Sequence, residues 1–151
     1  MEIKMAVELN FKVVLGTKDG KSVQKELVGN DAENLMRKKI GEKVDGSSIG
    51  FDGYELEITG GSDKAGFPMR KGIQSPRKRI MIGKGVGFSG KKRGTKNMSH
   101  KRQKGLVKRR TVCGDMVSIN TAQINLKVLK AGSKPLVKAP VSEAEKTEKT
   151  E

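Results

Sequence analysis

The sequence predicts a mainly β fold: a small, partly closed β-barrel of six or seven strands with one short helix. Short stretches alternate apolar and polar residues with the period of two that a half-buried strand requires. Turns that contain glycine, asparagine or aspartate separate these stretches. With 151 residues, 34% of them hydrophobic, the chain can bury one modest core, and only one stretch has helical spacing.

The first two predicted strands form a hairpin. Residues 7–13 (VELNFKV) alternate strictly, and TKDG at 17–20 is a good turn because glycine adopts positive φ easily. The second strand follows at 21–28 (KSVQKELV). Further predicted strands are YELEIT (54–59), KRIMIG (78–83), LVKRRTV (106–112), MVSIN (116–120) and AQINLKVL (122–129).

The predicted helix covers NDAENLMRKKIG, residues 30–41. Asn30 is a suitable N-cap, Glu33 completes a capping box, and Gly41 ends the helix. One apolar stripe runs along it, made of Ala32, Leu35, Met36 and Ile40.

Residues 1–131 carry all the periodic patterns and are expected to form one domain. Residues 132–151 contain two prolines and four glutamates but no aromatic residue, which predicts a disordered C-terminal tail. The single cysteine, Cys113, excludes a disulfide framework and is expected to be a small buried residue. No apolar run has the length of a membrane span, so a soluble cytoplasmic protein is expected.

The positive charge is concentrated in one segment. The net charge is +15, yet residues 64–110 alone carry 17 lysines and arginines and no acidic residue. Such a segment repels itself unless a polyanion neutralises it, which indicates a nucleic acid as partner. An anionic membrane surface is the main alternative, but it needs an amphipathic basic helix, and the glycine spacing here opposes a helix.

Residues 83–105 are predicted to form a long basic loop between the strands at 78–83 and 106–112. Within it, GVGFSGKK (85–92) approaches the phosphate-loop pattern, but Lys92 stands where the magnesium-binding hydroxyl belongs, and no helix pattern follows. The glycines instead allow a phosphate chain to approach the backbone closely. Residues 84–105 have few apolar side chains, so we expect them to be disordered until RNA binds.

Aromatic residues make up only 3% of the chain, so no stacking platform for single-stranded bases is expected. Contacts to the phosphate backbone of a large folded RNA fit the segment better than base readout. The candidate RNA-binding residues are Lys64, Arg70, Lys71, Arg77, Lys78, Arg79, Lys84, Lys91, Lys92, Arg93, Lys96, Lys101, Arg102, Lys104, Lys108, Arg109 and Arg110.

Two blocks resemble a known family. ITGGSDKAGFPMRKG (58–72) closely resembles the signature of the S-six-e family of archaeal and eukaryotic small-subunit ribosomal proteins, and KRRTVCGDMVSIN (108–120) resembles its basic strand. The resemblance covers roughly residues 6–131 and implies a β-barrel body on small-subunit ribosomal RNA, beside neighbouring ribosomal proteins. The chain looks like the archaeal short form, without the long helical extension and phosphorylated serines of eukaryotic members.

Within the first block, Gly60 and Gly61 are expected to end a strand in a tight turn. Asp63 is the last acid before the basic segment and is expected to order the loop or pair with Lys64 or Arg70. Phe67 and Met69 are expected to plug the barrel.

No residue pattern indicates catalysis. The only histidine, His100, lies in the basic loop without a cysteine or carboxylate near it in sequence. We therefore expect no enzyme, cofactor, metal site, small-molecule substrate or membrane partner. The competing hypothesis is a free-standing nucleic-acid chaperone or DNA-compacting protein, which would have the same charge.

Overall fold

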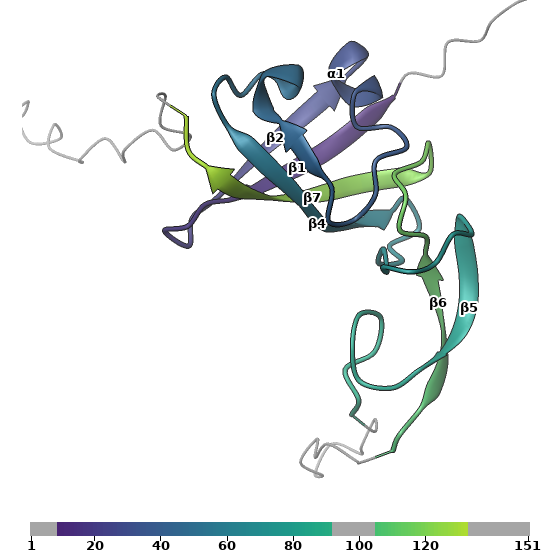
Figure 1. The fold of residues 1–151 in the computed structure, drawn as a ribbon. Coiled ribbons are helices and arrows are strands. Elements are labelled where there is room, and N and C mark those ends of the chain that lie inside the picture. Colours follow the sequence, from purple (N-terminus) through teal and green to yellow (C-terminus); the bar gives the residue numbers. More distant parts are fainter. Residues whose placement is uncertain (1–8, 92–104, 133–151) are drawn as a thin grey trace, which may run out of the picture.

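The computed structural model describes residues 9–91 and 105–132, and within these ranges the protein is mainly β, as predicted. A five-stranded sheet has the order β2-β1-β7-β4-β3 and curls into a half-barrel (Figure 1). Its strands are β1 (Asn10–Gly16), β2 (Ser22–Val28), β3 (Lys43–Asp45), β4 (Glu55–Asp63) and β7 (Thr121–Lys130). The other elements are α1 (Asn30–Glu33), the 3-10 turn η1 (Gly46–Ile49), and a two-stranded ribbon of β5 (Arg77–Ile82) and β6 (Lys108–Cys113).

The core lies inside the curl of the sheet. β1 and β7 pair in parallel, while the other neighbouring strands are antiparallel. Alternate residues of the strands point inward and are almost fully buried, as the period of two requires. They are Phe11, Val13, Leu15, Leu56, Ile58, Ile124, Leu126 and Val128.

Side chains connect the two open edges of the sheet. Lys25 of the edge strand β2 donates a hydrogen bond to the carbonyl oxygen of Ile49, 3.1 Å away. Its ammonium group also lies 4.7 Å from the centre of the Phe51 ring. Ile49 belongs to η1, which follows the opposite edge strand β3. The barrel is therefore closed here by a lysine and an aromatic ring and not by a strand ladder.

The predicted helix over 30–41 is wrong beyond residue 33. α1 ends at Glu33, its N-cap is Gly29 at φ 67°, and no side chain caps it, so the predicted capping box does not form. The following backbone bonds to another segment: the amide of Arg37 donates to Val117, and the amide of Val117 donates to Lys38. These bonds replace the helical ones, although the apolar stripe still packs on the core.

The predicted strand at 116–120 is also wrong. Met116 makes only an isolated bridge with Lys39, and a turn from Ser118 to Thr121 follows, closed by the 3.1 Å bond from the Ser118 amide to the Thr121 hydroxyl oxygen. The short strand β3 was not predicted, because three residues give no readable period. The start of the first predicted strand and most of the predicted tail, 133–151, lie outside the described residues.

β4 does not end at its two glycines, contrary to expectation. It continues to Asp63, with a register shift between Ile58 and Gly60 in its pairing with β7. A Cβ atom on Gly61 would collide with the carbonyl oxygen of Gln123, whereas open space surrounds Gly60. Gly61 is thus needed for the close approach of β7 and not for a turn.

These two neighbouring glycines give a matched test of the sheet. We expect Gly61→Ala to lower the free energy of unfolding by about 1–3 kcal/mol, because the backbone must shift to admit the methyl group. Gly60→Ala should change it by less than about 1 kcal/mol, since the methyl group meets no atom. Urea denaturation of both variants measures the difference, and equal midpoints would contradict the packing role of Gly61.

Candidate nucleic-acid interface

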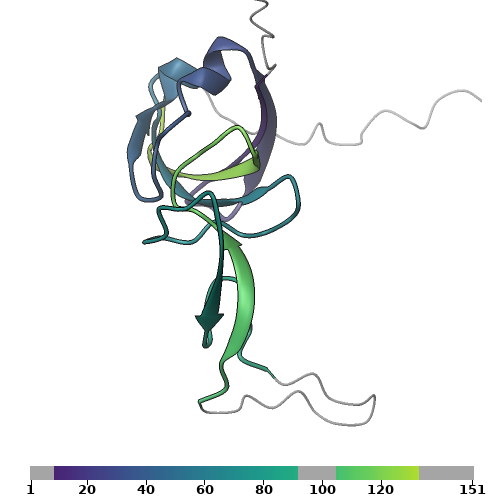
Figure 2. The same cartoon turned by 90° about the vertical axis from the view of Figure 1, so that its right-hand side faces the viewer.

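The ribbon of β5 and β6 projects from the half-barrel (Figures 1 and 2). Its antiparallel register runs from Arg77 opposite Cys113 to Ile82 opposite Lys108. Six of its twelve residues are lysine or arginine and none is acidic. The ribbon thus brings together two groups of predicted RNA-binding residues that are about 30 positions apart in the sequence.

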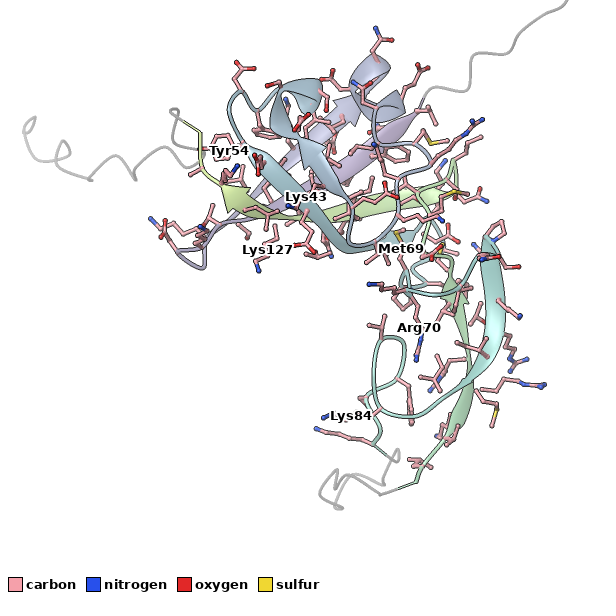
Figure 3. The ribbon with its side chains drawn as sticks, viewed as in Figure 1. Lys43, Tyr54, Met69, Arg70, Lys84 and Lys127 are labelled. Carbon is pink, nitrogen blue, oxygen red and sulfur yellow. The ribbon has the colours of Figure 1, made fainter. Side chains whose placement is uncertain are left out.

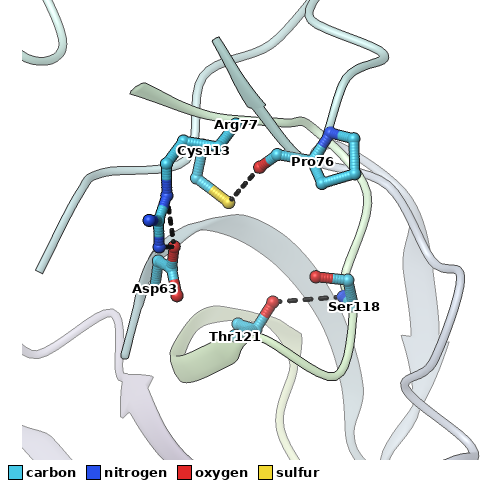
Figure 4. A network of polar contacts seen from close by, with 6 residues as sticks. All are labelled: Asp63, Pro76, Arg77, Cys113, Ser118 and Thr121. Atoms are coloured by element: carbon cyan, nitrogen blue, oxygen red, sulfur yellow. Dashed lines mark hydrogen bonds and ion pairs between the residues drawn. The ribbon is translucent and has the colours of Figure 1, made fainter. Parts of the chain in front are cut away.

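The chain that follows β4 holds the root of the ribbon. The amide of Cys113 donates to the carbonyl oxygen of Pro68 at 2.9 Å, and the amide of Arg70 donates to Cys113 at 3.2 Å. The thiol of Cys113 donates to the carbonyl oxygen of Pro76 at 3.2 Å (Figure 4). Burial, and then the nearby Asp63 carboxylate, raise the pKa of Cys113, so this thiol is a packing residue, as predicted.

An ion pair with a buried carboxylate fixes the same root. Asp63, only 3% exposed, accepts hydrogen bonds from Nε of Arg77 at 3.0 Å and from Nη2 (Figure 4). The expected partners, Lys64 and Arg70, do not pair with it in the described chain. Sequence reasoning did not identify Arg77 as the partner of Asp63, because the 13 residues between them fold back before β5 begins.

The two apolar residues of the signature block take different places. Met69 is 3% exposed and belongs to the main core, as predicted. Phe67 is only partly buried, and its ring lies 5.0 Å below the Arg77 guanidinium. The expectation that Phe67 plugs the barrel is therefore wrong: the ring supports the ion pair at the root of the ribbon.

The start of the basic loop is folded against the ribbon. Phe88 is 8% exposed and forms a second apolar cluster with Ile73, Ile82 and Val112. The expectation that residues 84–105, with few apolar side chains, are disordered until RNA binds is thus wrong for their first part. Phe88 is the one large ring in that part, and this is the signal that sequence reasoning overlooked.

The turn at 85–88 differs from a phosphate-binding loop. The amides of Gly85 and Phe88 bond to each other's carbonyl oxygens, at 2.9 and 3.1 Å, so they do not point toward a ligand. Gly87, at φ 93°, packs against Val112, and an added Cβ would lie 3.0 Å from Cγ1 of that residue. Gly85 and Gly87 therefore allow a tight turn that packs on an apolar surface.

We therefore expect no saturable, magnesium-dependent ATP binding at micromolar ligand concentration. Titration calorimetry of the full chain with ATP and magnesium measures this directly. A saturable heat that disappears on adding EDTA would contradict the assignment of this turn as structural.

The two faces of the ribbon carry different neighbours. Its inner face is the side covered by Phe88 and contains Lys78, Ile80, Ile82, Lys108, Arg110 and Val112, by the strand register. Its outer face contains Arg77, Arg79, Met81, Arg109, Thr111 and Cys113. Lys108 and Arg110 lie 5.9 and 5.8 Å from the Phe88 ring centre, which agrees with their place on the inner face.

Most of the described candidate residues are open to solvent. Arg70 is half-buried and donates from Nη1 to the carbonyl oxygen of Val86 at 3.1 Å, and Lys108 is also half-buried. Figure 3 shows Arg70 and Lys84 on the side of the molecule where the basic loop begins. Besides the paired Arg77, the exposed candidates are Lys64, Lys71, Lys78, Arg79, Lys84, Lys91, Arg109 and Arg110. Lys92, Arg93, Lys96, Lys101, Arg102 and Lys104, with His100, lie outside the described residues.

The outer face of the half-barrel has mixed charge. Lys43 and Lys127 lie there (Figure 3), and both stand opposite Glu57 in the strand register. The ribbon, by contrast, contains no acidic residue, and among the described residues only Arg77 of its six cations has a carboxylate partner. The excess positive charge of the described part is therefore located on the ribbon, its root and the start of the basic loop.

Residues 9–91 and 105–132 contain no group of three histidine, cysteine or acidic side chains arranged to hold a metal ion. Among the described helices, none is long and apolar enough to cross a membrane.

The fold and its surface define a small β-barrel protein whose excess charge is carried by one projecting basic ribbon. The family model "Ribosomal protein S6e" matches residues 11–140. The chain belongs to this family, which confirms the resemblance seen in the two sequence blocks. It is a family of structural ribosomal proteins, so the prediction that the chain is not an enzyme is confirmed.

Curated archaeal relatives named "Small ribosomal subunit protein eS6" match most of the chain. The protein of Methanothermobacter thermautotrophicus is 40% identical over 127 residues, covering 83% of this chain and 91% of its own length. That of Methanococcus maripaludis is 40% identical over 134 residues, covering 87% and 97%. That of Natronomonas pharaonis is 38% identical over 128 residues, covering 84% and 91%.

The ion pair at the root of the ribbon predicts unequal effects for two neighbouring cations. Arg77→Gln leaves a buried carboxylate without its charged partner and should lower the free energy of unfolding by about 2–3 kcal/mol. This is below the value for a fully buried pair, because the Arg77 side chain remains 46% exposed. Lys78→Gln should change it by at most about 0.5 kcal/mol. Urea denaturation measures both, and equal effects would contradict the structural role of Arg77.

Proposed function

We propose that this protein is a structural constituent of the small ribosomal subunit, bound to ribosomal RNA in the cytoplasm through its acid-free segment, residues 64–110. In this role it supports subunit assembly and translation, with ribosomal RNA and neighbouring ribosomal proteins as partners. Membership of the Ribosomal protein S6e family supports the ribosomal role. The single structural observation that carries the RNA-binding part is the ribbon, where cations without a carboxylate partner project from a folded base.

The geometry favours contacts with phosphates over contacts with bases. The rings of Phe67 and Phe88 lie beneath cationic groups of the ribbon, so neither offers an open face for stacking. Exposed lysines and arginines on a paired β-ribbon can instead follow a phosphate chain, whose position depends on the fold of the RNA. We assign this role to the exposed candidate residues and propose residues 1–131 as the folding unit that presents them.

Arg77 is assigned differently from the other candidates. Its guanidinium is bonded to Asp63 and stacked on Phe67, so its effect on RNA binding is through the direction of the ribbon. The remaining exposed ribbon cations, Lys78, Arg79, Arg109 and Arg110, and the half-buried Lys108 contact RNA directly in this proposal.

RNA binding should weaken steeply with salt. If about eight cations contact phosphates, log K should fall against log of the salt concentration with a slope of about −6 to −7, because each contact releases condensed counterions. Fluorescence anisotropy with small-subunit ribosomal RNA from an archaeal relative measures this slope. A slope near −1 would mean that the acid-free segment is not the binding surface.

Co-sedimentation distinguishes a subunit component from a free-standing nucleic-acid chaperone or DNA-compacting protein. A component should remain with small subunits through a sucrose gradient at high salt, because its contacts are specific to the folded particle. A chaperone or DNA-compacting protein depends on non-specific charge and should be stripped into the upper fractions. Complete loss from the subunit peak would contradict the proposed function.

A further inference from the structure

Cations are exposed on both faces of the ribbon. On the inner face these are Lys78 and Arg110, and on the outer face Arg79 and Arg109. Residues that alternate along a strand project to opposite sides, so these two pairs point away from each other. Each face therefore presents two exposed cations that have no carboxylate partner. Arg77 is not counted, because Asp63 neutralises it.

A single phosphate chain lying on one face does not reach the cations of the other. The inner face is also covered in part by the segment that holds Phe88, which packs on Ile82 and Val112 and thickens this part of the ribbon. The major groove of A-form RNA is deep and narrow, which opposes insertion of so thick an element into one duplex. Two RNA segments, one against each face, satisfy both sets of cations without this insertion.

The outer face carries an exposed apolar residue as well. Met81 is 61% exposed and stands directly opposite Arg109 in the register. The wide, shallow minor groove of an RNA duplex displays 2′-hydroxyls and base edges, which side chains on such a surface can reach. The outer face is thus suited to RNA in its own right.

We propose that the β5–β6 ribbon lies between two RNA segments, one on each face, and joins them. This inference rests on the proposed function and extends it: the protein links separate parts of the ribosomal RNA instead of coating one of them. The shared chemistry is a phosphate backbone on each side of the ribbon, with Asp63 and Arg77 fixing the direction in which the ribbon enters.

Two matched double variants of the full chain test the bridge. Lys78→Gln with Arg110→Gln changes the inner face, and Arg79→Gln with Arg109→Gln changes the outer face. Both remove two exposed charges from the same two strands. Lys18→Gln with Lys21→Gln, in the exposed turn between β1 and β2, removes the same charge far from the ribbon and is the control.

The probes are two 20-base-pair RNA duplexes, one labelled with a donor and one with an acceptor fluorophore. Mass photometry gives the stoichiometry, and energy transfer reports duplexes held together. Wild type and control should form a complex of one protein with two duplexes. Each face variant should keep one duplex and bind the second about tenfold more weakly, with a salt slope less steep by about 2.

Three results would overturn the bridge. A wild-type complex that stops at one duplex means that one RNA occupies the ribbon, while a two-duplex complex that persists in either face variant means that this face is not used. If the variant changed on the outer face keeps the two-duplex complex but is incorporated less well into small subunits, the outer face is assigned to a neighbouring protein instead. Wild type that binds neither duplex, at any salt concentration, would contradict the proposed RNA-binding function itself.

Melting temperatures keep a folding defect separate from a binding defect. All four substituted ribbon residues are exposed, so both face variants should melt within about 2 °C of wild type. A variant that melts lower is replaced by its lysine–arginine exchange, which keeps the charge on that face. Restored bridging by the exchanged pair supports the proposal, and no restoration contradicts it.

Discussion

The ion pair of Asp63 and Arg77 joins the half-barrel, whose surface has mixed charge, to the ribbon, whose charged residues are all cations. The half-barrel balances its charge, with carboxylates facing lysines across neighbouring strands. The ribbon has no acidic residue of its own, so its cations repel one another when no polyanion is present. Asp63, at the end of β4, supplies a carboxylate at the point where the ribbon begins, and burial strengthens its attraction for Arg77.

The rest of the ribbon depends on that fixed root. Backbone bonds from Cys113 to Pro68 and from Arg70 to Cys113 attach β6 to the chain that follows β4. The small apolar cluster around Phe88 then holds the ribbon in place beyond its root. Ile82 and Val112 of the ribbon pack on Phe88 there, which removes the apolar surface of the inner face from water. An ordered ribbon loses less conformational entropy on binding than a flexible basic loop would.

This arrangement explains how a chain with 19 glycines and few aromatic residues presents a defined surface. The main core is used to close the half-barrel, and a second, smaller one holds the ribbon and the start of its loop. Two glycines make the close contacts possible: Gly61 lets β7 approach β4, and Gly87 lets the loop lie on Val112. The family signature around residues 58–72 thus coincides with the joint between barrel and ribbon.

The sequence by itself determined the mainly β class and the segment that holds the charge. It also determined in outline the strands at 7–13, 21–28, 54–59, 78–83, 106–112 and 122–129. Each of these depends on period-two alternation or composition, which are local properties that a single chain displays. The tertiary structure alone decided that the helix ends at Glu33, that Gly61 lies inside a strand, and that Arg77 forms an ion pair with Asp63. It also decided that four exposed cations divide between two faces. These outcomes depend on partners far away in sequence, since a backbone group bonds to whichever segment packing brings beside it.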